Sequence, residues 1–255
     1  MTTLSKLNMT GHGKAKLLIV MVLLFGSSIC AADIFLTSEN LNASLKDMQR
    51  LQRQFLNVVG EERNNILYQL GIEADTLAKL LTDEVAAHGP QNEGLISLAL
   101  ERTEKIAIDI SWYGQHQSFY YDGSAFEQYL RASPEGQHAP DSLYRQIKRN
   151  FYLIADGSTQ DLISSSNAKK QFIGRYPDFA EIHELELFLA IDLRDLWRHY
   201  RASSDNAAAR DMEYQVREQY ERIIDRYQDR EAADIARRLL ARFEEELRQR
   251  GQDSP

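Results

Sequence analysis

Two groups of acidic and histidine side chains have a spacing that suits a metal ion. Asp192, Asp195 and His199 are three and seven residues apart, so on a helix they would share one face. Arg194 and Arg198 lie between them. Such a mixture of opposite charges is typical of a solvated helix face held by ion pairs, and this interpretation is favoured over a metal site. It also applies to a second group, made up of Glu181, His183 and Glu186.

An aromatic run at residues 112–121 offers the best candidate for a binding site. Trp and Tyr are favoured anchors at protein interfaces because they bury a large area and keep a polar end. The neighbouring glutamine and histidine side chains could bond a peptide backbone or a sugar. The alternative is that these rings pack between helices, and the sequence leaves both interpretations open. The candidate partner-binding residues are Trp112, Tyr113, His116, Phe119 and Tyr120.

The chain lacks the sequence motifs of the common enzyme classes. It has no Gly-x-Ser-x-Gly nucleophile turn, no His-Glu-x-x-His metal motif and no glycine-rich phosphate loop. With 38 acidic residues, a carboxylate pair for glycoside cleavage cannot be singled out. We therefore expect a protein that is not an enzyme and has no cofactor or metal. A periplasmic protein that binds or processes cell-wall glycan or peptide is the alternative.

The N-terminal segment has the layout of a secretory signal peptide. Three lysines and no acidic residue precede an apolar run at 17–25, and Ala31-Ala32 offers a small-residue cleavage site. Cys30 raises the alternative of lipid modification, but Ile29 before it is bulky where a small residue is usual. We expect export to the periplasm, with membrane association only through an uncleaved or lipidated N-terminus.

Charge excludes one class of partner. The chain has 30 basic and 38 acidic residues and a formal net charge of −8. Nucleic-acid phosphates require clustered Lys and Arg, so we expect no nucleic-acid partner.

Composition and periodicity predict an almost entirely helical protein. Ala, Leu, Glu, Arg and Gln are strong helix formers, and prolines are only five. Apolar residues recur at helical spacing through most of the chain. The helix at 179–200 is apolar over so much of its circumference that we expect it to be packed on more than one side. The other helices are expected at 38–59, 62–87, 94–121, 125–134, 141–155, the segment before Pro177, 206–227 and 231–250.

A short phrase occurs three times, at 129–134, 172–177 and 223–228, each time between two expected helices. Self-similarity at spacings of about 40–50 residues is typical of helical repeat proteins. Proline cannot continue the preceding helix, which suits a turn. The residues expected to form the repeat turns are Pro134, Tyr176, Pro177 and Tyr227, and the third copy has Gln228 in place of proline.

The repeated unit resembles the tetratricopeptide-type repeats of exported bacterial proteins, in particular the BamD-like families of the cell envelope. The matching positions are Phe126, Tyr129, Leu130, Pro134 and Ala139, then Phe172, Ile173, Tyr176, Pro177 and Ala180, then Tyr220, Ile223, Ile224, Tyr227 and Ala232. The resemblance implies stacked antiparallel helical hairpins in a right-handed solenoid. It also implies a protein–protein interaction scaffold or adaptor of the envelope, whose partner is a protein or peptide segment.

These expectations divide the chain into a signal peptide (1–32), N-terminal helices (33–93), a repeat array (94–250) and a disordered tail (251–255). A further hypothesis is a coiled-coil adaptor that oligomerises through the arm at 38–59.

Overall fold

The computed structural model describes residues 36–89, 93–114, 116–154 and 157–252, which form helices packed on helices together with one small β-hairpin. The expected signal peptide, with Cys30, therefore lies outside the described residues, as do the last three residues of the expected tail. No described helix has an apolar stretch long enough to cross a membrane. The elements are α2 (Ser38–Asn57), α3 (Gly60–His88), α4 (Glu93–Lys105), β1 (Ile110–Tyr113), β2 (Ser118–Tyr121), α5 (Ser124–Ala132), α6 (Ala139–Leu153), α7 (Thr159–Arg175), α8 (Ile182–Ala202), α9 (Asn206–Arg226) and α10 (Glu231–Gln252).

The chain forms two compact units. Among the described residues, the first contains 36–46 and Ala74–Asp122, and the second contains Asp47–Glu73 and the chain from Gly123 to residue 252. The domain boundary expected at residue 94 is not one of these division points and stays a prediction of the sequence.

The first unit contains the clearest departure from the expected fold. A single helix at 94–121 is wrong: α4 ends at Lys105, and the chain then forms the antiparallel strands β1 and β2. The strands pair in the register Ile110↔Tyr121, Ser111↔Tyr120, Trp112↔Phe119 and Tyr113↔Ser118. The alternation of buried side chains along the strands explains why this segment forms a hairpin. Ile110, Phe119 and Tyr121 all point to one face and are buried there.

The hairpin is held by the part of α3 from Ala74 onward, which belongs to the same unit. The Thr82 hydroxyl accepts a hydrogen bond from the backbone N–H of Phe119 at 2.8 Å, which occupies the outer edge of β2. Nearby on α3, the buried carboxylate of Glu84 accepts from the backbone N–H of Leu36 at 2.9 Å. The Thr82 hydrogen bond thus joins β2 to α3, whose residues Leu77, Ala78 and Leu81 are buried.

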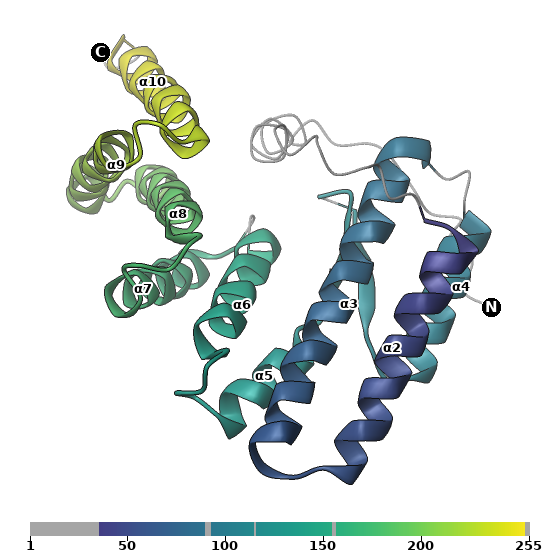
Figure 1. Ribbon diagram of the computed structural model, residues 1–255. Helices are drawn as coiled ribbons and strands as arrows, with labels where there is room; N and C mark the ends of the chain where they lie inside the picture. Colours follow the sequence, from purple (N-terminus) through teal and green to yellow (C-terminus); the bar gives the residue numbers. More distant parts are fainter. Residues whose placement is uncertain (1–35, 90–92, 115, 155–156, 253–255) are drawn as a thin grey trace. The chain divides into compact units, whose positions relative to one another are not determined.

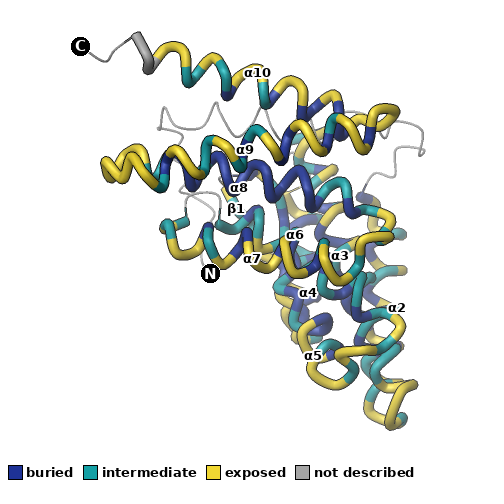
Figure 2. The backbone as a smooth tube through the Cα atoms, turned by 90° about the vertical axis from the view of Figure 1, so that its left-hand side faces the viewer, coloured by how far each residue is buried: buried dark blue, intermediate teal, exposed yellow. Residues whose placement is uncertain are grey.

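In the second unit, α5 to α10 follow one another in chain order, each packed on the next (Figure 1). Helix α8 packs on α7, α9 and α10. It is the most deeply buried helix of the row, whereas α9 and α10 keep long exposed faces (Figure 2). The prediction that this helix is packed on more than one side is confirmed, with bounds shifted by two or three residues.

The three copies of the repeated phrase adopt the same turn. Helices α5, α7 and α9 end at C-cap residues with φ, ψ of −145°, 66°, then −128°, 60°, then −122°, 40°. The N–H of each C-cap residue donates to the carbonyl four residues earlier, at 2.8–3.0 Å. Two further backbone hydrogen bonds then follow at intervals of three residues in every copy. The residues so linked are Ser133, Gly136 and Ala139, then Tyr176, Phe179 and Ile182, then Tyr227, Arg230 and Ala233.

Candidate functional site

The predicted aromatic site is brought together, but on a hairpin and not on a helix. Trp112 and Phe119 face each other across the strands with ring centroids 4.9 Å apart. Tyr113 and Tyr120 lie on the opposite face at 5.4 Å, and the ring of His116 meets Tyr120 edge-on at 6.3 Å. The alternation of the strands therefore divides four of these side chains between two faces, and His116 lies in the turn between the strands.

Burial decides which of these rings a partner could touch. Phe119 and His116 are buried, so they belong to the packing of the first unit. Trp112, Tyr113 and Tyr120 are half-buried. Burial raises the pKa of Tyr120 to about 12, so its hydroxyl stays protonated at neutral pH. Of the five predicted residues, Trp112, Tyr113 and Tyr120 are therefore the ones that a partner could contact.

The predicted repeat turns are all turns in the structure. Pro134 and Pro177 directly follow the C-cap residues of α5 and α7, and Tyr176 and Tyr227 are the C-cap residues of α7 and α9. A guanidinium lies over the tyrosine ring in the last two copies. Arg175 is 5.3 Å from the ring centroid of Tyr176, and Arg226 is 5.4 Å from that of Tyr227.

The same two arginines join each turn to the preceding copy. Arg175 pairs with Glu135, which is 40 residues earlier beside the first turn. Arg226 pairs with Glu186, also 40 residues earlier, at 2.9 Å. Its other terminal nitrogen donates to the carbonyl of Pro177 at 3.3 Å. The periodic sequence therefore becomes a periodic set of contacts between neighbouring helix pairs.

The first group considered for a metal is split among separate partners. Asp192 pairs with Lys169 at 2.6 Å, and His199 Nδ1 lies 3.1 Å from the hydroxyl of Thr159. Asp195 pairs with Arg198 at 3.0 Å. Across the described ranges, no three His, Cys, Asp or Glu side chains are grouped closely enough to hold a metal ion. The expected solvated face is wrong for Asp192, because its position on α8 faces α7 and is buried.

In the second group, Glu186 and His183 also have separate partners. The carboxylate of Glu186 pairs with Arg226, as above, and His183 Nδ1 lies 3.3 Å from a guanidinium nitrogen of Arg230. Glu186 is fully buried, so the solvated-face interpretation is wrong for this residue too.

Lys169 and Asp192 form a buried ion pair between α7 and α8. The ammonium of Lys169 also donates to the hydroxyl of Ser165 and lies 5.0 Å from the ring centroid of Phe151. Burial lowers the pKa of Lys169 and raises that of Asp192, while their mutual attraction acts in the opposite direction on both. A lysine beside a serine can activate a nucleophile, but the Lys169 side chain is fully buried.

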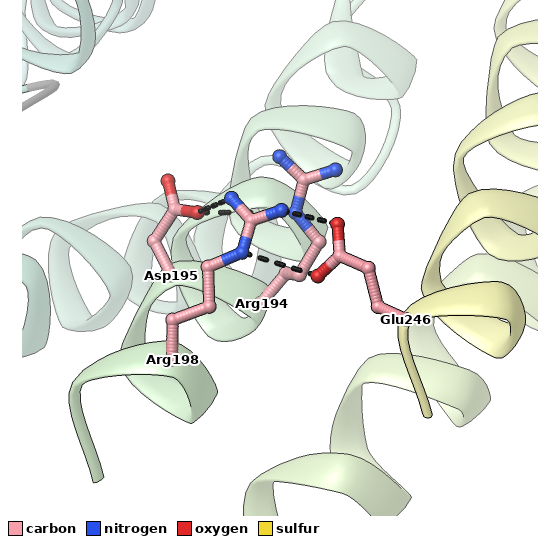
Figure 3. Close-up of polar contacts among 4 residues, drawn as sticks. All are labelled: Arg194, Asp195, Arg198 and Glu246. Atoms are coloured by element: carbon pink, nitrogen blue, oxygen red, sulfur yellow. Dashed lines mark hydrogen bonds and ion pairs between the residues drawn. The ribbon is translucent and has the colours of Figure 1, made fainter. Parts of the chain in front are cut away.

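A second charged cluster lies where α8 meets α10 (Figure 3). Arg198 donates to Asp195 at 3.0 Å and to Glu246 at 2.5 and 3.3 Å. Within the described part of the chain, Arg194 makes one ion pair, a long contact of 3.8 Å from its Nε to Asp195. Burial raises the pKa of Asp195, against the pull of the two arginines. No local sequence pattern points to this site, because Glu246 is 48 residues from Arg198.

The cluster differs chemically from the hairpin. Its guanidinium groups are fixed donors that stay charged at all physiological pH values, and Arg194 retains donor capacity that the described residues do not use. Its two carboxylates balance its two guanidinium groups in charge, and the cluster offers neither a nucleophile nor a general base with free access. No protein-family model matches the chain, and no curated protein sequence matches it either.

Proposed function

We propose that this chain is an exported, tetratricopeptide-like repeat protein that binds partner proteins as a scaffold or adaptor of the cell envelope. In this proposal α5 to α10 are stacked antiparallel helical hairpins of a right-handed solenoid, and the chain carries out no catalysis. Repeats of this type present extended surfaces to a partner, whereas enzymes need a closed pocket with reactive groups.

One observation supports the proposal most strongly. Three turns that are 43 and then 51 residues apart share one backbone hydrogen-bond pattern, and two of them reach back 40 residues through an arginine. A helix pair with this connection cannot bury both faces alone and must stack on its neighbours. The export and envelope parts of the proposal rest on the sequence of residues 1–32.

In-cell crosslinking of the tagged full chain, followed by mass spectrometry, tests this function. We expect one protein partner to be captured reproducibly. A matched pair of variants then asks whether the hairpin contributes: Trp112→Ala with Tyr113→Ala changes the half-buried rings, and Ser111→Ala changes an exposed neighbour. Loss of capture with the first variant alone, in a folded protein, assigns the partner to the hairpin. Capture of cell-wall fragments and of no protein would contradict the proposal.

A further inference from the structure

The two edges of the hairpin differ in what covers them. The outer edge of β2 is closed by α3, because the Thr82 hydroxyl accepts from the N–H of Phe119 at 2.8 Å and lies 3.5 Å from the carbonyl oxygen of the same residue. A threonine side chain thus takes the place that a neighbouring strand would occupy. No described residue makes a comparable contact with the outer edge of β1.

The register shows which backbone groups of β1 point away from β2. Trp112 lies opposite Phe119. Opposite residues of an antiparallel ladder either exchange both hydrogen bonds or make none with each other. Because the N–H of Phe119 is used on Thr82, its pair with Trp112 has no mutual hydrogen bonds. The 2.9 Å bond from the N–H of Asp122 to the carbonyl of Asp109 fits the same alternation. The N–H and C=O of Trp112 therefore point outward from the hairpin.

These outward groups lie in a part of β1 that solvent reaches. Trp112 is half-buried, and Ser111 and Gly114 to either side of it are exposed. Ile110, whose backbone groups point the same way, is buried. Within the part of the chain that the structure describes, the N–H and C=O of Trp112 have no hydrogen-bond partner. Unpaired backbone groups at a sheet edge are a template for another strand.

The sequence does not protect this edge in the usual ways. Natural edge strands carry lysine, proline, a bulge or an inward charge, and each of these discourages pairing with another chain. Residues 110–121 contain no Asp, Glu, Lys, Arg or Pro, and the four residue pairs of the hairpin are in continuous register. An edge that is uncharged and regular is suited to accept a strand.

The chemistry of the edge determines the kind of occupant. Trp112 presents a donor and an acceptor together, and one residue of an extended chain matches both. A helix cannot do so, because its backbone groups are used within the helix. The side chain of the matching residue would lie on the same face as Trp112, whose ring packs 4.9 Å from that of Phe119, so an apolar side chain fits there. The next residue would lie on the face of the exposed Ser111, which suits a polar one.

We propose that the outer edge of β1 binds an extended, uncharged segment of the partner protein, which adds to the hairpin as a third strand through the N–H and C=O of Trp112. The inference rests on the proposed function and adds to it the form in which the partner is recognised. Main-chain hydrogen bonds hold the segment, and its alternate side chains fit the two faces. A second copy of β1 fits less well. A two-fold axis at Trp112 would place the partner copy's Gly114 against Ile110, which is buried.

Amide hydrogen exchange in the full chain tests the edge itself. We expect the N–H of Trp112 to exchange rapidly, whereas those of Tyr113 and Phe119 are protected, because one pairs with β2 and the other with Thr82. Protection of Trp112 in the unbound chain at low concentration would overturn the proposal, since the edge would already be covered. Protection that appears only as the chain concentration rises would make a second copy the occupant and would overturn it as well.

A short synthetic strand tests the occupant. The probe is the acetylated and amidated pentapeptide Thr-Val-Thr-Val-Thr, which is uncharged, favours an extended backbone and alternates in polarity. We expect it to protect the Trp112 N–H in a saturable way. Two matched probes carry N-methyl groups, one on the valine nitrogens and the other on the threonine nitrogens.

With a valine opposite Trp112, the valine N–H groups face β1. The first methylated probe should therefore bind about tenfold more weakly, and the second should bind as the parent does. Equal binding of the two methylated probes, or no saturable protection by the parent, would overturn the proposal.

Trp112→Pro and Trp112→Ala separate the main chain from the side chain. Both lose the indole, but only proline lacks the N–H, and proline is tolerated in an edge strand where the N–H points outward. We expect Trp112→Pro to bind the probe about fivefold more weakly than Trp112→Ala, which corresponds to one hydrogen bond. Equal binding by the two variants, with the Phe119 N–H protected in both, would contradict the proposal. If the proline variant loses that protection, the methylated probes decide.

The partner captured in cells distinguishes this inference from the proposed function. A partner captured equally by Trp112→Pro and by the unchanged chain would leave the scaffold function standing and refute the role of the edge. Probe binding at Trp112 without any captured protein would support the edge and refute the scaffold.

Discussion

Lys169 and Asp192 form an ion pair in which both charged side chains are buried. Both charges are removed from water between α7 and α8, and the pair is compensated by a 2.6 Å contact and the hydroxyl of Ser165. Desolvation of two ions roughly cancels their attraction, so the intact pair adds little net stability. Removal of one partner, however, leaves the other charge buried and unpaired.

Lys169→Met should therefore destabilise the protein by about 3–5 kcal/mol, as is usual when a buried pair loses one member. The double variant Lys169→Met with Asp192→Leu should recover most of that loss, because both charges are then gone. Urea unfolding of the two variants and the unchanged protein measures the difference. A single variant within about 0.5 kcal/mol of the unchanged protein would show that the pair is not buried as described.

Glu184 of α8 gives the fold a pH dependence on the acid side. Burial alone would raise the pKa of Glu184, but attraction to Lys148 and the hydrogen bonds from Lys148 and Tyr144 lower it below its ordinary value. A carboxyl whose pKa is lowered on folding stabilises the protein above its unfolded pKa and loses this contribution as the pH falls. The relevant window begins near pH 4.5 and extends downward.

Glu184→Gln should thus reduce the loss of stability on acidification below pH 4.5. Urea midpoints at pH 3 to 6 measure this slope. Glu62→Gln changes an exposed carboxylate in the same unit and serves as the control. If both variants lose stability with the same slope as the unchanged protein, Glu184 is not held by Lys148 in solution.

At the level of elements, α8 is the helix on which the second unit depends. It contacts α6, α7, α9 and α10, and its residues are buried along most of its length. Leu193→Ala should cost about 2–5 kcal/mol, the range for a large buried side chain replaced by a small one. Leu56→Ala removes the same atoms from a side chain that is 79% exposed in the same unit, and should cost under about 0.5 kcal/mol. Thermal unfolding of the two variants checks the contrast, and equal losses would refute the central position of α8.

The hairpin shows why one element was predicted wrongly. Periodicity over 94–121 was assigned to a single helix because several apolar residues there fit helical spacing. The competing signal was present as an alternation of Ile108, Ile110 and Trp112, followed by Gly114 and then Phe119 and Tyr121. Four-residue strands give too few alternations to outweigh a helical pattern around them. Strongly periodic helices elsewhere were predicted to within a few residues.

Among the candidate sites, too, some could be predicted from the sequence and others could not. The repeat turns could be predicted because each is a local phrase of six residues that fixes its own backbone. The contacts of Arg198 with Glu246 and of Lys169 with Asp192 could not, since they join residues 48 and 23 positions apart. Only the fold determines which charged side chains become buried. For that reason Arg194 was assigned to a solvated face.

At the scale of the whole molecule, Arg175 and Arg226 make equivalent ion pairs in successive copies of the repeated phrase, so the two pairs can be compared. Arg226 pairs with Glu186, whose side chain is 1% exposed, whereas Arg175 pairs with Glu135, which is 80% exposed. Arg226→Met should destabilise the protein by about 1–3 kcal/mol, because it leaves a buried carboxylate unpaired. Arg175→Met, at the equivalent place in the preceding copy, should cost under about 1 kcal/mol. Chemical denaturation measures both, and the reverse order would contradict the described burial of Glu186.

Photo-crosslinking in cells tests the scaffold function most directly. Benzoylphenylalanine is placed in turn at exposed positions of α5, α8, α9 and α10: Arg131, Arg201, Tyr214 and Arg242. A repeat array that binds a protein along its surface should give the same captured partner from neighbouring positions. Capture of no common protein from any of the four, with each variant folded and present at normal levels, would contradict the account.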